Sequence, residues 1–189
     1  MWKQMIPAVR MTALLTVLTG LIYPAVVTGI CQVLFPTQAN GSLLLKNGKA
    51  VGSALIGQGF EKPEYFPSRP SAVAYDAAGS GGSNLGPVSQ KLIDRVKASA
   101  QQLRKEGYEG ALPADSVTTS ASGLDPHVSP EFARLHAARV AAARGIGTAE
   151  IGKLVERFTE GRDLGFLGEP RVNVLLLNLA LDEQFPVRR

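Results

Sequence analysis

The sequence predicts one globular α/β or α+β domain carried by a single N-terminal transmembrane helix. Residues 11–35 contain no charged side chain. A helix of that length extends about 37 Å, which is enough to cross a hydrocarbon core of about 30 Å. About 150 residues follow, the size of one ordinary domain, and they alternate between helix-like and strand-like patterns.

The chain divides into a cytoplasmic arm (1–10), the transmembrane helix (11–35), a linker (36–42) and a soluble extracytoplasmic domain (43–189). Lys3 and Arg10 are the only charges before the span, and cytoplasmic flanks are enriched in basic residues. We therefore predict a single-pass protein of the bacterial inner membrane with its N-terminus in the cytoplasm. A removable signal peptide is the alternative, but signal cores are only about 7 to 15 residues long.

The transmembrane helix is predicted to be kinked and to pack against other helices. Pro24 lacks the backbone N–H that an α-helix uses. Small residues spaced about four apart let a neighbouring helix approach closely, whereas in a lone anchor they would have no role. The predicted packing residues are Thr12, Thr16, Gly20, Pro24, Ala25 and Gly29.

The first half of the domain is predicted to hold a hairpin, a long loop and a helix. Short apolar runs at 43–45 and 50–56 flank Asn47-Gly48, a typical hairpin turn. Residues 57–86 are rich in glycine, proline and aromatic residues, which indicates a structured loop. Apolar residues at helical spacing then predict a helix over 87–105, with Pro87 in its first turn and Gly107 after its end.

The second half is predicted to contain two helices and a buried strand. Residues 111–126 are turn-rich, with room for one short strand. Ser129-Pro130-Glu131 is typical of a helix start, and the expected buried stripe is Phe132, Leu135, Arg139 or Val140, and Ala143. Thr148 is expected to cap a helix that ends before Gly161 and buries Ile151, Leu154, Val155 and Phe158. Leucines alternate within 172–181, which favours a strand and leaves a leucine-rich helix as the alternative.

Composition argues against a nucleic-acid-binding protein and against a disulfide-stabilised domain. The net charge is +4, and without Lys3 and Arg10 the chain has 18 basic against 16 acidic residues. This small excess is scattered, so it does not form a nucleic-acid surface. Cys31, the only cysteine, lies in the span, so the domain depends on core packing instead of disulfides.

Motifs for cofactors, metals and nucleotides are weak. Residues 52–59 (GSALIGQG) have the glycine spacing of a phosphate-binding loop, but Gln58 replaces the lysine that such a loop needs. His127 and His136 lack further ligands at metal-binding spacing. We expect no metal and no tightly bound cofactor.

The alternative function is a membrane-anchored extracytoplasmic serine hydrolase. Ser122, Asp125 and His127 supply the residue types of a catalytic triad. The sequence lacks the G-x-S-x-G elbow that would expose a nucleophilic serine, so we predict no catalytic residue.

Two loop segments have the composition of contact sites. Ser80, Gly81, Gly82, Ser83 and Asn84 offer hydroxyls and amides before a helix that includes Gln90, and such groups bind an anion or a partner's acidic side chain. A plain cap and turn is the alternative. Tyr65, Phe66 and Arg69 are of the types that dominate protein interfaces, and we predict that they dock a partner.

Seven segments, in order along the chain, resemble the C subunit family of the Kdp potassium-transporting ATPase. A departure is Pro67-Ser68, where the family pattern has histidine and glycine. The matching residues are Thr19 to Pro24, Phe35-Pro36 with Gln38 to Ser42, Gly52-Ser53 with Leu55 to Gln58, Tyr65-Phe66 with Arg69 to Ser71, Ser80 to Pro87, Ser120 to His127, and Leu167 to Asn173.

The resemblance implies a non-catalytic subunit of a four-subunit pump that imports K+ at the expense of ATP. Its partners would be a channel-like subunit, a P-type ATPase subunit and a small single-span subunit, which it would assemble and stabilise. The family has also been described as a catalytic chaperone that raises ATP affinity, with Ser80 to Asn84 likened to the signature loop of ABC transporters. Contact with cytosolic ATP conflicts with an extracytoplasmic domain, so we expect docking to be the main role.

Overall fold

The computed structural model describes residues 2–187. Residue 1 of the predicted arm and residues 188 and 189 of the predicted domain lie outside this range. The chain forms two compact units, Met1–Val51 and Gly52–Arg189, which are described separately.

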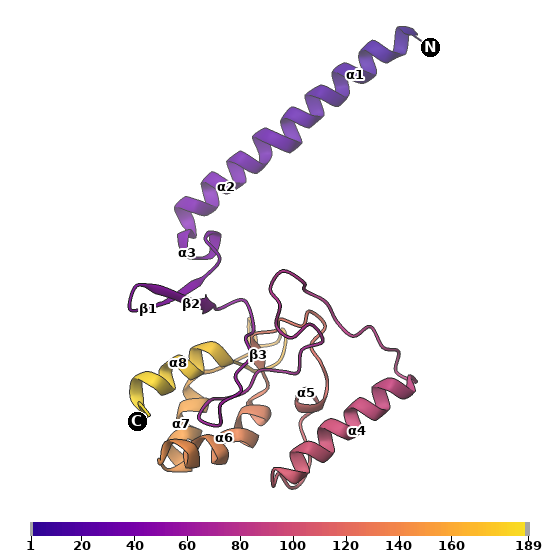
Figure 1. Cartoon of the computed structure of the whole chain (residues 1–189). Helices are drawn as coiled ribbons and strands as arrows, with labels where there is room; N and C mark the ends of the chain where they lie inside the picture. The colour runs from indigo at the N-terminus through magenta and orange to yellow at the C-terminus, as the bar shows by residue number, and fades with distance from the viewer. Residues whose placement is uncertain (1, 188–189) are drawn as a thin grey trace. The chain divides into compact units, whose positions relative to one another are not determined.

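The first unit begins with a 33-residue apolar helix, Trp2–Leu34, which is long and apolar enough to span a membrane, as predicted. It comprises α1 (Trp2–Val17), the π-helical turn η1 (Leu18–Ile22) and α2 (Tyr23–Leu34), which run on as one rod in Figure 1. Because the helix begins at Trp2, it includes the described part of the arm.

The π-turn explains how the helix passes Pro24. A proline ring would clash with the carbonyl of Gly20, four residues earlier, in a regular α-helix. The N–H of Tyr23 instead bonds the carbonyl oxygen of Leu18, five residues back, and this wider turn makes room for the ring. In place of the predicted kink, Pro24 is therefore accommodated by a π-turn on its N-terminal side, and the helix runs on as one rod.

A one-turn helix, α3 (Pro36–Ala39), occupies the predicted linker, and a hairpin follows. Strands β1 (Leu43–Lys46) and β2 (Lys49–Ser53) form a two-stranded sheet. Asn47 and Gly48 adopt φ values of 54° and 74°, the left-handed pair that a two-residue hairpin turn requires. The predicted hairpin is confirmed.

The second unit combines helices with a small antiparallel sheet, which confirms the mixed fold class. Residues 54–89 contain no helix or strand, as predicted for 57–86. Strand β5 lies between β3 and β4 and runs antiparallel to both. The elements are α4 (Gln90–Lys105), α5 (Ala114–Val117), β3 (His127–Val128), α6 (Pro130–Arg144), α7 (Thr148–Arg157), β4 (Thr159–Glu160), β5 (Arg171–Asn173) and α8 (Val174–Gln184).

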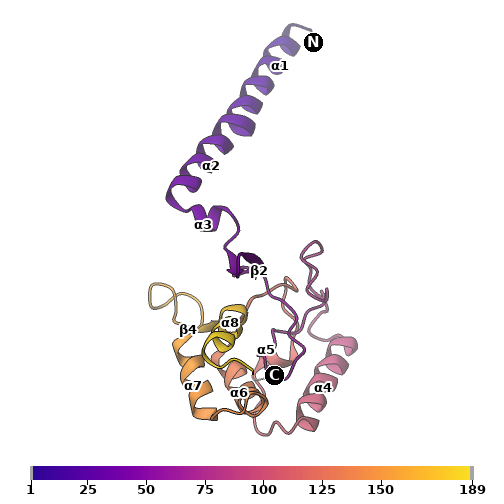
Figure 2. The ribbon, with the colours of Figure 1, turned by 60° about the vertical axis from the view of Figure 1, so that its left-hand side comes forward.

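The core of this unit lies among α6, α7, α8 and β5. Figures 1 and 2 show the three helices grouped together, with α4 on the other side of the unit. Ser129 caps α6 as predicted, because its Oγ accepts a hydrogen bond from the N–H of Phe132. The largest fully buried side chains are Phe66, Ile151, Leu154, Leu177, Leu181, Val140, Val155, Val172 and Val174.

The predicted strand over 172–181 is wrong beyond Asn173, and its helical alternative is correct. Only 171–173 are a strand, and α8 begins at Val174. Asn173 starts the helix, because its side chain accepts a hydrogen bond from the N–H of Leu176. A buried helix is apolar on most sides, so alternating leucines did not discriminate between the two structures.

Several predicted boundaries also differ. Helix α4 begins at Gln90 with Ser89 as its N-cap, so Pro87 precedes it. Gly147, rather than Thr148, is the N-cap of α7, and β4 separates that helix from Gly161. The 111–126 segment contains the short helix α5 and no strand.

The predicted stripe on α6 is partly wrong. Phe132 and Val140 are buried, but Ala143 is exposed and Leu135 is only half-buried. His136 takes a place in the core, between the rings of Tyr108 and Phe132. The buried face of α6 therefore includes this histidine, whose Nδ1 lies 2.6 Å from the Tyr108 hydroxyl.

Candidate functional site: a pocket built from three sequence segments

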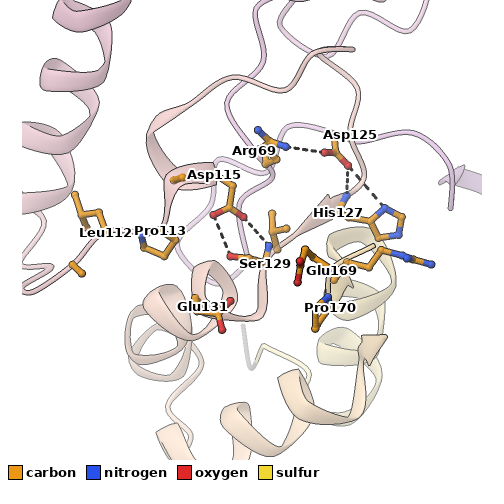
Figure 3. A pocket seen from close by; sticks show the side chains of 14 residues that line it. Arg69, Leu112, Pro113, Asp115, Asp125, His127, Ser129, Glu131, Glu169 and Pro170 are labelled. Atoms are coloured by element: carbon orange, nitrogen blue, oxygen red, sulfur yellow. Dashed lines mark hydrogen bonds and ion pairs between the residues drawn. The ribbon is translucent and has the colours of Figure 1, made fainter. Parts of the chain in front are cut away.

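A pocket of about 700 Å³ lies where three of the seven segments meet (Figure 3). Arg69 comes from the long loop, Asp125 and His127 from the segment before α6, and Glu169 and Arg171 from the segment before α8. Sheet pairing brings the last two segments together, since His127 on β3 lies opposite Asn173 on β5. The sequence separates these residues widely, and the fold places them on one surface.

Backbone and hydroxyl contacts fix the long loop against the 120–125 segment. The hydroxyl of Ser71 donates to the carbonyl oxygen of Gly123 at 2.7 Å, and the N–H of Gly57 donates to that of Leu124 at 2.8 Å. Ser120 N donates to the carbonyl oxygen of Pro70 at 3.1 Å. Arg69 is therefore held at the pocket by its neighbours in the chain.

Asp125 joins Arg69 and His127. Its Oδ2 accepts from Nη1 of Arg69 at 3.1 Å, and its Oδ1 accepts from the backbone N–H of His127 at 3.0 Å. The imidazole Nδ1 of His127 lies 3.9 Å from the same Oδ1. Burial lowers the pKa of His127, against the opposing effects of Glu160 and Asp125, so the ring is neutral at neutral pH.

A second aspartate shapes the opposite wall. Oδ2 of Asp115 accepts from the backbone N–H of Ser129 at 2.7 Å, and its Oδ1 accepts from the Ser129 hydroxyl at 3.1 Å. The same hydroxyl caps α6 through Phe132. The carboxylate of Asp115 and the hydroxyl of Ser129 are therefore both engaged in structural hydrogen bonds.

The charges at the rim are paired within the chain. The register of β4 and β5 places Glu160 beside Arg171, whose Nε donates to Oε2 of Glu160 at 3.0 Å. Nη1 of Arg171 also donates to Asp163 at 3.2 Å, and Arg162 donates to Glu169 at 2.7 Å. Because these charges are already compensated, a partner surface that covers the rim would leave no lone charge behind.

The pocket lacks the arrangement of a hydrolase. Within residues 2–187, no hydrogen bond joins His127 to a serine hydroxyl, and Ser122 Oγ accepts from the N–H of Leu124 at 3.1 Å. A triad needs a serine hydroxyl bonded to the imidazole. Nor do the described residues contain a group of three or more metal-binding side chains.

The predicted contact loop lies against the serine-rich segment. The hydroxyl of Ser80 and the N–H of Gly81 both donate to the carbonyl oxygen of Ser122, at 3.0 and 2.8 Å. A side chain on Gly82 would place its Cβ 2.6 Å from the carbonyl oxygen of Ala121. Glycine is therefore needed here for close packing of two chain segments.

The other residues of the predicted contact site are Ser83, Asn84 and Gln90, and each has its own local environment. Thr119 donates to the Ser83 hydroxyl at 3.5 Å, and Asn84 adopts a left-handed φ of 49°. Gln90 Nε2 donates to Asp94 within α4. A role of Ser80 to Asn84 and Gln90 in contacting nucleotide or a partner stays a prediction.

The predicted docking residues divide between core and surface. Phe66 is 0% exposed, and its backbone N–H and C=O each form a 2.9 Å hydrogen bond with the side chain of Asn178. Tyr65 donates to Asp182 at 3.2 Å beneath the guanidinium of Arg144. Phe66 has no surface to offer a partner, while docking through Tyr65 and Arg69 stays a prediction.

The predicted packing face of the apolar helix is open. A Cβ on Gly29 would meet nothing within 4 Å, and one on Gly20 would meet only Cγ2 of Thr16 at 4.0 Å. Thr12, Pro24 and Ala25 are likewise exposed. Their packing against other membrane helices stays a prediction.

Sequence reasoning missed Asn178 and the part of the rim formed by Glu169 and Arg171. Asn178 is the only polar residue between Val174 and Leu181. A lone amide in an apolar run indicates a buried hydrogen-bonding role, so a signal was present. The position of Arg171 depends on strand pairing between segments that are distant in the chain, and no local pattern indicates that pairing.

Comparison with known proteins gives consistent matches over the whole chain. The family model described as "KdpC: K+-transporting ATPase, c chain" matches residues 5–183. A protein of Koribacter versatilis is 54% identical, with 99% of this chain and 98% of the relative covered. One from Geobacter sulfurreducens is 53% identical, with 97% and 100% covered. Both relatives are named "Potassium-transporting ATPase KdpC subunit".

Proposed function

This chain belongs to the KdpC family, the c chain of the K+-transporting ATPase, and from that premise we propose the following role. It is a non-catalytic accessory subunit that assembles and stabilises the ion-conducting and ATP-hydrolysing subunits of a high-affinity K+ uptake complex. Its partners are the channel-like subunit, the P-type ATPase subunit and the small single-span subunit that the family resemblance implies.

The observation that carries this proposal is the exposed apolar helix. The 33-residue helix has no buried residue, and its small residues lie open for helix packing. Lipid and the helices of other subunits are the two environments that suit such a surface. The second unit supports the same role, because the charged side chains around the pocket that contains Arg69 and Asp125 are paired within the chain.

The domain is proposed to lie outside the cytoplasm. Lys3 and Arg10 precede the span, and acidic residues are absent from that arm, which favours a cytoplasmic N-terminus. Labelling of intact cells with a membrane-impermeant maleimide tests this, using Gln101→Cys on the exposed side of α4 in a Cys31→Ser background. Labelling without lysis supports the outside placement; labelling only after lysis contradicts it.

Nucleotide contact is the second candidate role. The loop from Ser80 to Asn84, which precedes the helix that contains Gln90, resembles the signature loop of ABC transporters. If the domain faced the cytosol, this loop would raise the affinity of the pump for ATP. Photolabelling of the intact complex with azido-ATP tests it. A label on residues 80–90 would favour this role over extracytoplasmic docking.

Co-purification tests assembly. The ATP-hydrolysing subunit carries the tag, and the other subunits are expressed with or without this chain. We expect the channel-like subunit to separate from the tagged subunit in detergent when this chain is omitted. Unchanged co-purification would contradict the proposal.

A further inference from the structure

We propose that the loop at residues 162–168 is a docking knob that inserts Leu164 and Phe166 into an apolar socket on another subunit of the K+-transporting ATPase. This inference rests on the proposed function, because it names the partner as a subunit of the same complex. Figure 2 shows the segment after β4 standing out from the rest of its unit.

The knob exposes large apolar side chains at its tip. Leu164 is 82% exposed, Phe166 is 70% exposed and Leu167 is 49% exposed. Single exposed apolar residues are ordinary on protein surfaces, whereas a cluster of them marks an interaction site. Leu164 and Phe166, the two tip residues, do not belong to the hydrophobic core of the second unit.

Backbone and ion-pair contacts fix the knob in one conformation. Asp163 and Leu167 exchange two backbone hydrogen bonds, each 2.9 Å long, and Gly165 N donates to Arg162 O at 3.1 Å. Arg171 on β5 donates a hydrogen bond to the carboxylate of Asp163, and Arg162 donates one to the carboxylate of Glu169, at the two ends of the knob, which form its stem. A preorganised loop loses little conformational entropy when it binds.

The backbone at Leu164 is an independent sign of function. Leu164 adopts φ = 54° and Gly165 adopts φ = 83°, the left-handed pair of a tight hairpin turn. Asparagine, aspartate or glycine is favoured at the first of these positions, because a bulky side chain is strained there. Leucine at position 164 is thus unfavourable for the turn and unfavourable in water, and folding alone does not account for it.

Charge and size select the kind of partner. Residues 160–171 carry three carboxylates and two guanidinium groups, a net charge of −1 that opposes adsorption to an anionic lipid surface. The tip side chains would bury about 400 Å² at most, far below the roughly 1,200–2,000 Å² of a stable dimer interface. A knob of this size suits a contact between subunits that a membrane helix already brings together.

The socket should therefore be apolar with a neutral or weakly basic rim. Arg162 and Arg171 are both paired with carboxylates, so the stem presents little free positive charge. A complementary rim would meet the exposed Glu169 rather than an arginine.

A competition experiment in the assembled complex tests the knob. Wild-type chain and a Leu164→Asn, Phe166→Ser variant are co-expressed with different tags and all the other subunits. Their ratio in the purified complex is compared with their ratio in total membranes. We expect the variant to be depleted about tenfold or more, because burial of two large apolar side chains is lost.

The control variant is Val88→Asn, which makes the same kind of change at a residue that is 91% exposed outside the knob. It should compete equally with wild type. Thermal unfolding of each full-length chain in detergent separates docking from folding. Leu164→Asn should unfold at the same temperature as wild type or higher, since asparagine tolerates the left-handed turn.

A photo-crosslinking benzoylphenylalanine at position 166 of the full complex identifies the occupant. A crosslink to another pump subunit is expected; a crosslink only to lipid or to a second copy of this chain would overturn the inference. Equal competition by the double variant would overturn it too, provided that wild type enters the complex. Absence of wild type from the complex would instead refute the proposed function.

Discussion

Asn178→Leu should destabilise the second unit strongly, because this side chain satisfies two buried backbone groups. Oδ1 of Asn178 accepts from the N–H of Phe66, and its Nδ2 donates to the Phe66 carbonyl, both at 2.9 Å. Phe66 is 0% exposed and Asn178 is 2% exposed, so water cannot replace either bond in the native structure.

The magnitude follows from those two groups. A buried donor or acceptor left without a partner costs about 1–3 kcal/mol, which gives about 2–6 kcal/mol for both. Leucine has the same number of side-chain heavy atoms as asparagine and a similar branched shape, and burial of its apolar atoms offsets about 1 kcal/mol. The free energy of unfolding should therefore fall by about 1–5 kcal/mol.

Urea titration of the full-length chain in detergent micelles, followed by circular dichroism, measures this change. Gln101→Leu on the exposed side of α4 is the matched control, since it replaces an amide by leucine at a side chain that forms no hydrogen bond within residues 2–187. The control should shift by less than about 0.5 kcal/mol. An equally small shift for Asn178→Leu would refute the conclusion that this amide anchors the long loop.

Gly82→Ala should lower the free energy of unfolding by about 1–3 kcal/mol in the same titration, because its Cβ would lie 2.6 Å from a backbone oxygen; Gly86→Ala, whose Cβ meets nothing within 4 Å, is the control, and equal shifts would contradict the close packing. Burial lowers the pKa of His136 from 6.5 to about 4, so the neutral ring stabilises the fold above pH 6.5 and this contribution is lost as the pH falls towards 4. Relative to His136→Gln, wild type should lose about 1.4 kcal/mol per pH unit between pH 6 and the native pKa of about 4, and parallel pH profiles would show that the ring is not buried. Gly20→Leu should weaken retention of this chain in the detergent-solubilised complex, whereas Val26→Leu, outside the small-residue spacing, should not; equal retention of both would argue against the packing face.

Local signals predicted the parts of the fold that depend on a few adjacent residues. Asn47-Gly48 made the hairpin turn and Ser129 capped α6, because each acts on backbone groups within three residues. The alternation of leucines failed as a guide to 172–181, because a helix buried on most sides has the same composition as a buried strand. There the cap formed by Asn173 was the deciding feature.

The pocket could be predicted only in part. Its residues Arg69, Asp125 and Arg171 all lie in segments that the sequence marked as distinctive, but their proximity depends on the pairing of β3 with β5 and on Arg69 reaching Asp125 across 56 residues. Phe66 was predicted to dock a partner, and this prediction was wrong because the side chain is buried. An aromatic residue in a Gly/Pro-rich loop looks like an interface residue, yet tertiary packing placed it in the core.

The most direct test of the account is K+-stimulated ATP hydrolysis by the detergent-purified complex, measured with this chain present, absent and added back in increasing amounts. The account predicts that hydrolysis is weak without the chain, recovers at about one copy per complex, and is undetectable for the chain alone. Full K+-stimulated hydrolysis by a complex that lacks the chain, or hydrolysis by the chain in isolation, would contradict an accessory role.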